Sequence, residues 1–282
     1  MFTISAFADE IDMDLTVQMD VLDKYGIRYI EMRGVNGKNL SDCTPQEAKD
    51  IKRQLDARGF RLSAVGSPIG KIGISDDFAP HLEQFKRVLD IAHIMETRYI
   101  RMFSFFIPKG ENPDVYEDAV LERWRQFVDA AKGSGVTLLH ENEKGIYGDN
   151  AERCLRLLQL LDCPNVRATF DPANFVQCGV EPYPHAYELL KPYIAYLHIK
   201  DAKFADGRVT PAGQGDGRVP DILASLKSGG FDGFLSLEPH LADFEGFAAL
   251  ERECDASKPD KSKGALLFGM AADALTGILE RI

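Results

Sequence analysis

The chain has 282 residues, of which 27% are charged and 45% hydrophobic, and its net charge is −11 with a pI near 5.1. The length suffices for one large domain, since a barrel of eight strand–helix units needs about 250 residues. The acidic balance and the absence of a basic run give no support to nucleic-acid binding.

Targeting signals are missing from the sequence pattern. The first residues, MFTISAFADEID, lack the basic and apolar regions of a signal peptide. No apolar run approaches the roughly 18 residues that cross a bilayer. The five cysteines are scattered and without CxxC spacing, a pattern typical of reduced thiols. We therefore expect a cytoplasmic protein that does not act in a membrane.

Short apolar segments alternate with amphipathic ones along the whole chain, and glycines at 59, 135 and 230 separate several helices from the strands that follow. The predicted strands span residues 2–7, 27–33, 60–66, 98–103, 136–141, 166–171, 194–200 and 233–238. The predicted helices span residues 13–25, 45–58, 76–95, 114–132, 149–161, 184–191, 219–228 and 264–281.

Eight such units without a break in composition predict an α/β fold, a closed (β/α)8 TIM barrel that forms a single domain over residues 1–282. The alternative is a doubly wound open sheet, which usually carries a glycine-rich turn after its first strand. Here the first strand runs into 6-AFADEID-12, which contains no glycine. The barrel is therefore favoured.

One segment interrupts the alternation. Residues 241–264, LADFEGFAALERECDASKPDKSKG, form a charged, proline-containing insertion between the last strand and the last helix. A loop there lies at the catalytic face of a barrel, where it would serve as a lid or a subunit contact. A surface loop without a function is the alternative, and the sequence leaves both open.

The most informative segment is 139-LHENEKGIYGD-149, because a predicted strand ends there in acidic side chains. A barrel places metal ligands and acid–base groups at the C-terminal tips of its strands. The next three predicted strands also end in polar groups, so that the candidate set is Glu141, Asp171, His198 and Glu238. Each alone would more simply cap a helix or pair in a loop, but four successive tips indicate a ligand set.

Three carboxylates and an imidazole are suitable ligands for one divalent metal ion, Mn, Co, Mg or Zn. Without a cation, carboxylates crowded at one barrel mouth would repel one another and raise each other's pKa. The sequence therefore predicts a metal site at the mouth.

With these residues in view, the chain resembles the xylose isomerase-like barrels of the sugar phosphate isomerase and epimerase group over essentially its whole length. In that family the metal ligands are Glu, Asp, His and Glu from strands five to eight, which match Glu141, Asp171, His198 and Glu238. The pair of motifs 198-HIKD-201 and 213-GQGDG-217 is a further resemblance. The resemblance implies a small carbohydrate substrate, and because oligomers are common among relatives, a homo-oligomer is possible.

Differences between this sequence and members of the family narrow the expected number of metals and the expected activity. Endonuclease IV, a distant member, holds three metals with extra histidines on strands three and four, where this chain has Gly66-Ser67-Pro68 and Phe103-Ser104-Phe105. Asn174 stands where that enzyme has a third histidine. Phe204 replaces an arginine of the ketose 3-epimerases. The resemblance thus implies one metal, and it argues against DNA repair and against a free-ketose 3-epimerase.

The activity that the resemblance implies is isomerisation or epimerisation of a sugar or sugar phosphate. Glu141 and Glu238 are the expected catalytic pair, which would remove and return a proton beside a metal-bound carbonyl through an enediolate. Glu143 competes for the role of base, or else pairs with Lys144. The alternative is a lyase or dehydratase acting on a keto-inositol or 3-keto glycoside, with His140, His240 or Lys200 as acid. An alternative of another class is a non-catalytic sugar-binding barrel.

Other polar side chains near the expected mouth are candidates for contacts with the substrate. Glu31 and Arg33 end the second strand, and His140 should face away from the barrel interior by strand alternation. The predicted substrate-binding residues are Glu143, Lys71, Arg101, Asn174, Lys200 and His240.

Overall fold

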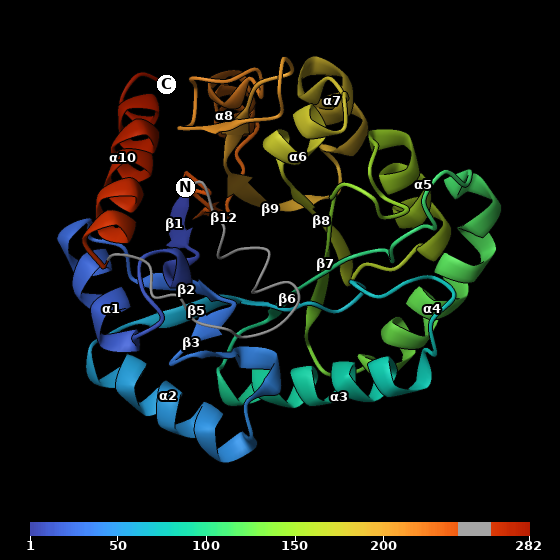
Figure 1. Ribbon diagram of the computed structural model, residues 1–282, viewed down its shortest axis with the longest axis horizontal. Coiled ribbons are helices and arrows are strands. Elements are labelled where there is room, and N and C mark those ends of the chain that lie inside the picture. Colours follow the sequence, from blue (N-terminus) through green and yellow to red (C-terminus); the bar gives the residue numbers. More distant parts are fainter. Residues whose placement is uncertain (242–260) are drawn as a thin grey trace.

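The computed structural model describes residues 1–241 and 261–282, so the predicted lid or contact segment at 241–264 lies almost wholly outside the described residues. Eight parallel strands close into a barrel in the order β1-β12-β9-β8-β7-β6-β5-β2. Helices surround this ring of strands (Figure 1). The predicted single-domain α/β barrel is therefore confirmed.

Each barrel strand lies within a segment that the apolar pattern predicts. The strands are β1 (Thr3–Ala6), β2 (Tyr29–Met32), β5 (Arg61–Gly66), β6 (Tyr99–Met102), β7 (Thr137–Glu141), β8 (Val166–Phe170), β9 (Ile194–Ile199) and β12 (Phe234–Leu237). β1 pairs with β12 from Thr3↔Phe234 to Ala6↔Leu237, and this pairing closes the ring.

Every predicted helical segment contains a helix. The helices are α1 (Leu15–Lys24), α2 (Pro45–Ala57), α3 (Ala79–Ile94), α4 (Glu117–Ala130), α5 (Ala151–Leu161), α6 (Pro172–Gln177), α7 (Tyr187–Leu190), α8 (Val219–Ser228) and α10 (Lys261–Leu279). α2 begins with a capping box, in which the Thr44 side chain accepts from the Glu47 amide and the Glu47 carboxylate accepts from the Thr44 amide. No described helix is long and apolar enough to cross a membrane.

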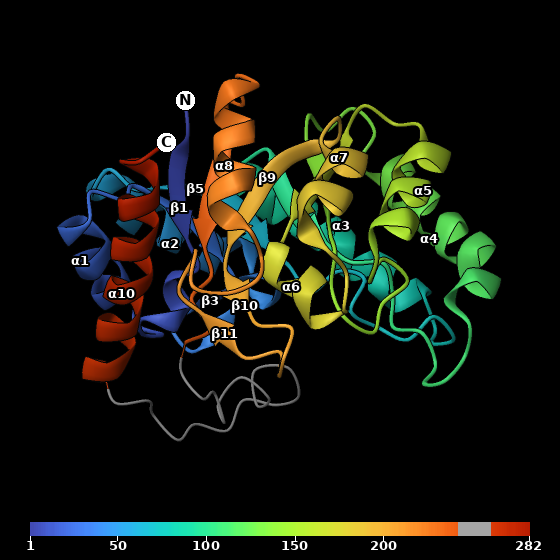
Figure 2. The same ribbon diagram turned by 90° about the horizontal axis from the view of Figure 1, so that it is seen from above.

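Several short features of the described residues were not predicted, and three of them bear on the barrel mouth; they are too short for a periodic pattern. The hairpins β3 (Gly34–Val35) with β4 (Lys38–Asn39) and β10 (Asp201–Ala202) with β11 (Val209–Thr210) follow β2 and β9. The third is α6, whose cap is Asp171: its Oδ1 accepts from the Asn174 amide at 2.8 Å. The labels of β3, β10 and β11 in Figure 2 lie on the side of the molecule away from both termini.

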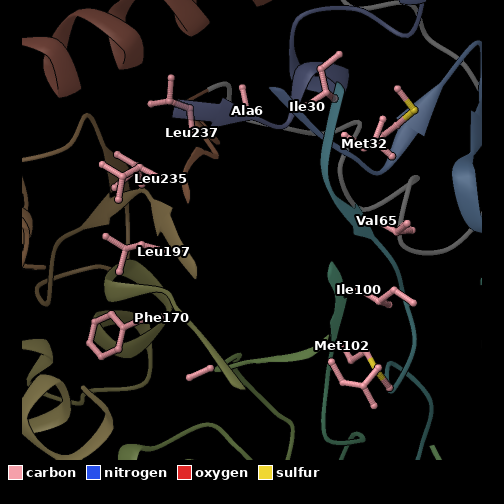
Figure 3. Packing of buried hydrophobic residues seen from close by; sticks show 14 of the residues in the cluster. Ala6, Ile30, Met32, Val65, Ile100, Met102, Phe170, Leu197, Leu235 and Leu237 are labelled. Atoms are coloured by element: carbon pink, nitrogen blue, oxygen red, sulfur yellow. The ribbon is translucent and has the colours of Figure 1, made fainter. Parts of the chain in front are cut away.

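The main hydrophobic core lies between the barrel and its helices. Strand alternation turns one set of side chains outward, and Figure 3 shows Ile30, Ile100, Phe170 and Leu197 pointing away from the middle of the ring. These four side chains are at most 1% exposed. Burial on this scale, about 25 cal/mol for each Å² of apolar surface, is the main force that closes the fold.

The barrel interior is filled at one level by a smaller cluster of Ala64, Tyr99, Leu139 and Tyr196. The Tyr196 hydroxyl lies 2.8 Å from Ser63 Oγ, which lies 2.6 Å from Ser5 Oγ. The interior is therefore packed rather than hollow, and the charged side chains that face inward are grouped toward the C-terminal ends of the strands.

Candidate metal centre

The four predicted ligands come from four neighbouring strands. Glu141 is the last residue of β7 and His198 the last but one of β9, while Asp171 and Glu238 directly follow β8 and β12. All four are at most 2% exposed. Because parallel strands end at the same rim of the barrel, these tips converge.

The converging side chains form a cluster of metal-binding dimensions. One ligand atom from each of the four residues lies within 4.8 Å of every other. His198 Nδ1 is 3.0 Å from Glu141 Oε1, 3.6 Å from Asp171 Oδ2 and 3.6 Å from Glu238 Oε2. The described structure thus brings together the whole set that the strand tips predict.

The donor set fits a divalent cation. Three carboxylates and one imidazole are ligands common to Mg²⁺, Mn²⁺ and Zn²⁺ sites. Among the described residues, Asp171 Oδ2 is buried without a hydrogen bond of good geometry, although Lys200 Nζ lies 3.0 Å away. A buried carboxylate oxygen left in this way costs free energy unless a charged partner compensates, and a cation held by the cluster would do so.

Glu141 is ionised by its surroundings. Burial alone would raise its pKa, but His198 and Arg101 lower the pKa to about 2. Arg101 Nη1 donates to Glu141 Oε2 at 2.9 Å, and Asn174 Nδ2 donates to Oε1 at 3.2 Å. Glu141 therefore carries the negative charge that a ligand or a base needs.

Lys200 lies inside the cluster rather than at its edge. Its Nζ donates to Glu238 Oε2 at 2.8 Å and lies 3.0 Å from Asp171 Oδ2. Burial alone would lower the pKa of Lys200, but these two carboxylates hold it well above its usual value. Burial would raise the pKa of Glu238, yet Lys200 and His240 hold it well below its usual value. The two groups are therefore a buried ion pair.

The side chain of Glu143 pairs with Lys71 and not, as one prediction had it, with the side chain of Lys144. β7 ends at Glu141, so Glu143 does not share that residue's orientation through a continued strand. Glu143 Oε2 lies 3.4 Å from Lys71 Nζ, whereas Lys144 contributes only its backbone amide, which donates to Glu143 Oε1. Lys71 also lies 4.4 Å above the Phe103 ring. The predicted contact residues Glu143 and Lys71 thus form one ion pair near the rim.

His140 does not belong to the site, which excludes it as the acid of a lyase. Its Nε2 lies 2.9 Å from Ser104 Oγ, and its ring packs edge-on against Trp124. Burial lowers the pKa of His140 to about 4. The outward orientation expected from strand alternation is correct.

Asp9 and Glu10 also lie at the barrel mouth, although the sequence pattern assigned neither of them a role. Asp9 and Glu10 follow β1, and the Arg33 guanidinium contacts both, with Nε 2.7 Å from Asp9 Oδ2. Glu10 Oε1 lies 3.1 Å from His240 Nε2, which is 3.4 Å from Glu238 Oε1. The strand-tip pattern of 6-AFADEID-12 was the signal that could have shown these acids. Arg33 Nη1 lies 3.5 Å from the same oxygen, Glu238 Oε1, so Arg33 and His240 connect these acids to Glu238.

The motifs 198-HIKD-201 and 213-GQGDG-217 are joined in the structure by hydrogen bonds to Asp201. The Asp201 carboxylate accepts hydrogen bonds from the amides of Gly213, Gly215 and Gly217 at 2.8 to 3.0 Å. A Cβ on Gly215 would lie 2.4 Å from the Ala202 carbonyl oxygen. The glycines let the 213–217 loop approach β10, and Asp201 holds that loop against the strand.

Comparison with protein families gives one match. The model of the family described as xylose isomerase-like TIM barrel matches residues 19–259. Comparison with curated protein sequences gave no match.

Comparison with solved structures gives many similar chains, among them three with 15–17% sequence identity. The probable 3-DHS dehydratase AsbF of Bacillus anthracis is 17% identical with a TM-score of 0.74, covering 98% of this chain and 99% of that one. D-psicose 3-epimerase of Clostridium cellulolyticum H10, solved with D-tagatose, is 15% identical with a TM-score of 0.74 and 99% coverage of both chains. IOLI protein, solved with a zinc atom, is 16% identical with a TM-score of 0.75, covering 100% and 99%.

Proposed function

The chain belongs to the family of xylose isomerase-like TIM barrels, and on that premise we propose that it is a metal-dependent isomerase or epimerase of a small sugar or sugar phosphate. The observation that carries the proposal is the buried cluster of Glu141, Asp171, His198 and Glu238. The proposed reaction moves a proton at a carbon next to a carbonyl group.

In this proposal the four side chains of the cluster hold one divalent cation, of which the type is left open among Mn, Co, Mg and Zn. Such a cation, when bound, polarises a carbonyl oxygen and stabilises the negative charge that develops as a neighbouring C–H bond breaks. Solved relatives support a metal here, since one of them holds a zinc atom.

The proposed proton carriers are Glu141 and Glu238. One carboxylate takes the proton from carbon, and the same or the opposite carboxylate returns a proton to the neighbouring carbon or to the other face. Both groups are held in the ionised form by the neighbouring cations, which lower their pKa values, so neither carboxylate already carries a proton. Arg101 and Asn174 hold Glu141 by hydrogen bonds and so fix its direction.

The second candidate is a lyase that eliminates water or an aglycone next to the carbonyl group. Lys200 favours it, because a buried ammonium 2.8 Å from Glu238 Oε2 could protonate a leaving oxygen after Glu238 or Glu141 has taken the proton from carbon. A dehydratase also occurs among the structural relatives. The proton abstraction is common to both candidates.

Incubation with ketoses, inososes and 3-keto glycosides in deuterated water tests the proposal. An isomerase or epimerase incorporates deuterium at carbon without elimination, whereas a lyase releases water or the aglycone. We expect Glu141→Gln and Glu238→Gln to lower the exchange rate by at least about 100-fold, the usual scale for one acid–base group. Glu188→Gln is the control, because the Glu188 side chain on α7 is exposed.

A protein that purifies with no metal, gains none from added Mn²⁺, Co²⁺, Mg²⁺ or Zn²⁺, and exchanges no proton would contradict the proposal. That outcome would leave the non-catalytic sugar-binding barrel as the better interpretation.

A further inference from the structure

We propose that Glu31 is a positioning residue of the metal centre: its carboxylate accepts the Nε2 proton of His198 and so presents Nδ1 to the cation. The inference rests on the proposed function in one respect, namely that the cluster binds a metal.

Glu31 lies on β2, across the barrel from His198, and is fully buried. Between Ile30 and Glu31 the register of β2 against β5 shifts. Irregularities of this kind turn side chains to new directions and are common next to active sites. A carboxylate buried without partners is costly, so its position here calls for a specific contact.

That contact is the outer nitrogen of the His198 ring. Glu31 Oε1 and Oε2 lie 3.3 Å and 3.2 Å from Nε2. The second described ionic neighbour of Glu31 is Arg101, whose Nε is 3.9 Å from Oε1. Both carboxylate oxygens are therefore directed at one nitrogen of one imidazole.

The other nitrogen of the same ring faces the ligands. His198 Nδ1 lies within 3.6 Å of oxygens from Glu141, Asp171 and Glu238. Phe7 packs edge-on against the ring, with centroids 5.2 Å apart. The imidazole is thus held between a carboxylate on one side and the ligand cluster on the other, with an aromatic contact limiting its rotation.

A metal-binding imidazole must be neutral, with its proton on the nitrogen away from the metal. A carboxylate that accepts this proton selects the tautomer, orients the ring and makes the ligating nitrogen more basic. The arrangement of Glu31, His198 and the cluster matches this chemistry. The strand-tip pattern alone could not reveal it, because Glu31 reads equally well as a contact for substrate.

A different role for Glu31 would be that of a counter-ion to protonated His198 in the metal-free protein. The two roles predict different effects of removing Glu31 on the affinity for the metal. A counter-ion favours the proton that competes with the metal, so its removal would leave metal binding unchanged or make it tighter. A positioning residue favours the binding tautomer, so its removal weakens metal binding.

Titration of metal-free protein with Mn²⁺, and separately with Zn²⁺ against a competing chelator, measures the dissociation constant. We expect Glu31→Gln to raise it by about 10- to 100-fold, the usual effect of losing such a partner. Ser63→Ala is the matched control, since Ser63 is 1% exposed in the same interior and bonds to Ser5 and Tyr196 instead of His198. We expect the metal dissociation constant of Ser63→Ala to equal that of the wild type.

Glu31→Asp separates charge from position, and it decides the matter if the glutamine variant does not fold. It keeps a buried negative charge but withdraws the carboxylate from Nε2, so we expect weaker binding here too. Folded variants whose dissociation constants equal or fall below that of the wild type would overturn the role of Glu31. A wild-type protein that binds neither metal would instead overturn the proposed metal centre itself, and the inference with it.

Discussion

At the scale of single residues, the barrel mouth is defined by buried side chains of opposite charge held close together. The groups that contact one another there are Glu31, Glu141, Asp171, Glu238, Arg101, His198 and Lys200. The three basic groups offset only part of the charge of the four carboxylates, and burial makes each unpaired charge expensive. A metal bound by the cluster would place a like charge beside Lys200.

His140 gives a prediction for pH, because its pKa falls from 6.5 to about 4 on burial. The unfolded chain binds the proton more tightly, so the stabilising effect of the neutral ring is complete above pH 6.5 and is lost as the pH falls toward 4. The loss should amount to about 3 kcal/mol. We expect His140→Gln to reduce the slope of unfolding free energy against pH in this range, as measured by urea denaturation.

The control for this prediction is His185→Gln. His185 is half-exposed and pairs with Glu152 on the surface, so its replacement should leave the wild-type slope in place. If His140→Gln has the same slope as the wild type, the ring is not the source of acid sensitivity. His81 also has a pKa lowered to about 4 by burial, so part of the slope should remain in the variant.

The residues of the ligand cluster were predictable because strand tips can be read from the sequence. An apolar run that ends in Glu141 or Glu238 shows both the strand and the rim of the barrel. The partner of Glu143 was not predictable, since Lys71 lies 72 positions earlier in the chain and no local pattern links the two. The contact of Glu31 with His198 spans 167 positions and depends on closure of the barrel.

At the scale of elements, long periodic segments were predictable and short ones were not. The apolar face of α5, with Cys154, Leu157 and Leu158 buried, repeats at helical spacing and is visible in the sequence. α6 has six residues, and the hairpin strands β3 and β10 have two each. Such elements form because tertiary contacts hold them, as the hydrogen bonds from the 213–217 loop to Asp201 illustrate.

Gly215 gives a prediction for this loop. A Cβ at this position would lie 2.4 Å from both the Ala202 carbonyl oxygen and Asp201 Oδ1, distances that require the backbone to move. We expect Gly215→Ala to lower the free energy of unfolding by about 2 kcal/mol or more, measured by urea denaturation.

Gly277→Ala on α10 is the matched control. The nearest atom to a Cβ there is Arg281 Nη1 at 3.4 Å, and alanine is the better helix former by about 1 kcal/mol. Its stability should equal or slightly exceed that of the wild type. Equal stability for Gly215→Ala and the wild type would show that the loop can move away from Asp201 without cost.

At the scale of the whole molecule, closure of the eight-stranded barrel brings the four residues of the ligand cluster together. The four clustered side chains lie at the C-terminal ends of β7, β8, β9 and β12, which are consecutive neighbours in the barrel. The barrel was predictable from the sequence, because both the eight alternating strand–helix units and the polar residues at the strand tips indicate the same fold. A cytoplasmic location, a homo-oligomer and a role for residues 241–264 stay predictions, the last because that segment lies outside the described residues.

Closure of the ring couples metal binding to folding, because the unfolded chain does not hold the four ligands together. A metal at 100 times its dissociation constant should therefore raise the free energy of unfolding by about 2.7 kcal/mol. We expect added Mn²⁺ to increase the urea midpoint of the wild type and chelation to reverse the increase. Glu238→Gln should lose most of this gain, whereas Glu143→Gln, which lies outside the ligand cluster, should retain it. Equal gains in both variants would place the stabilising metal elsewhere on the protein.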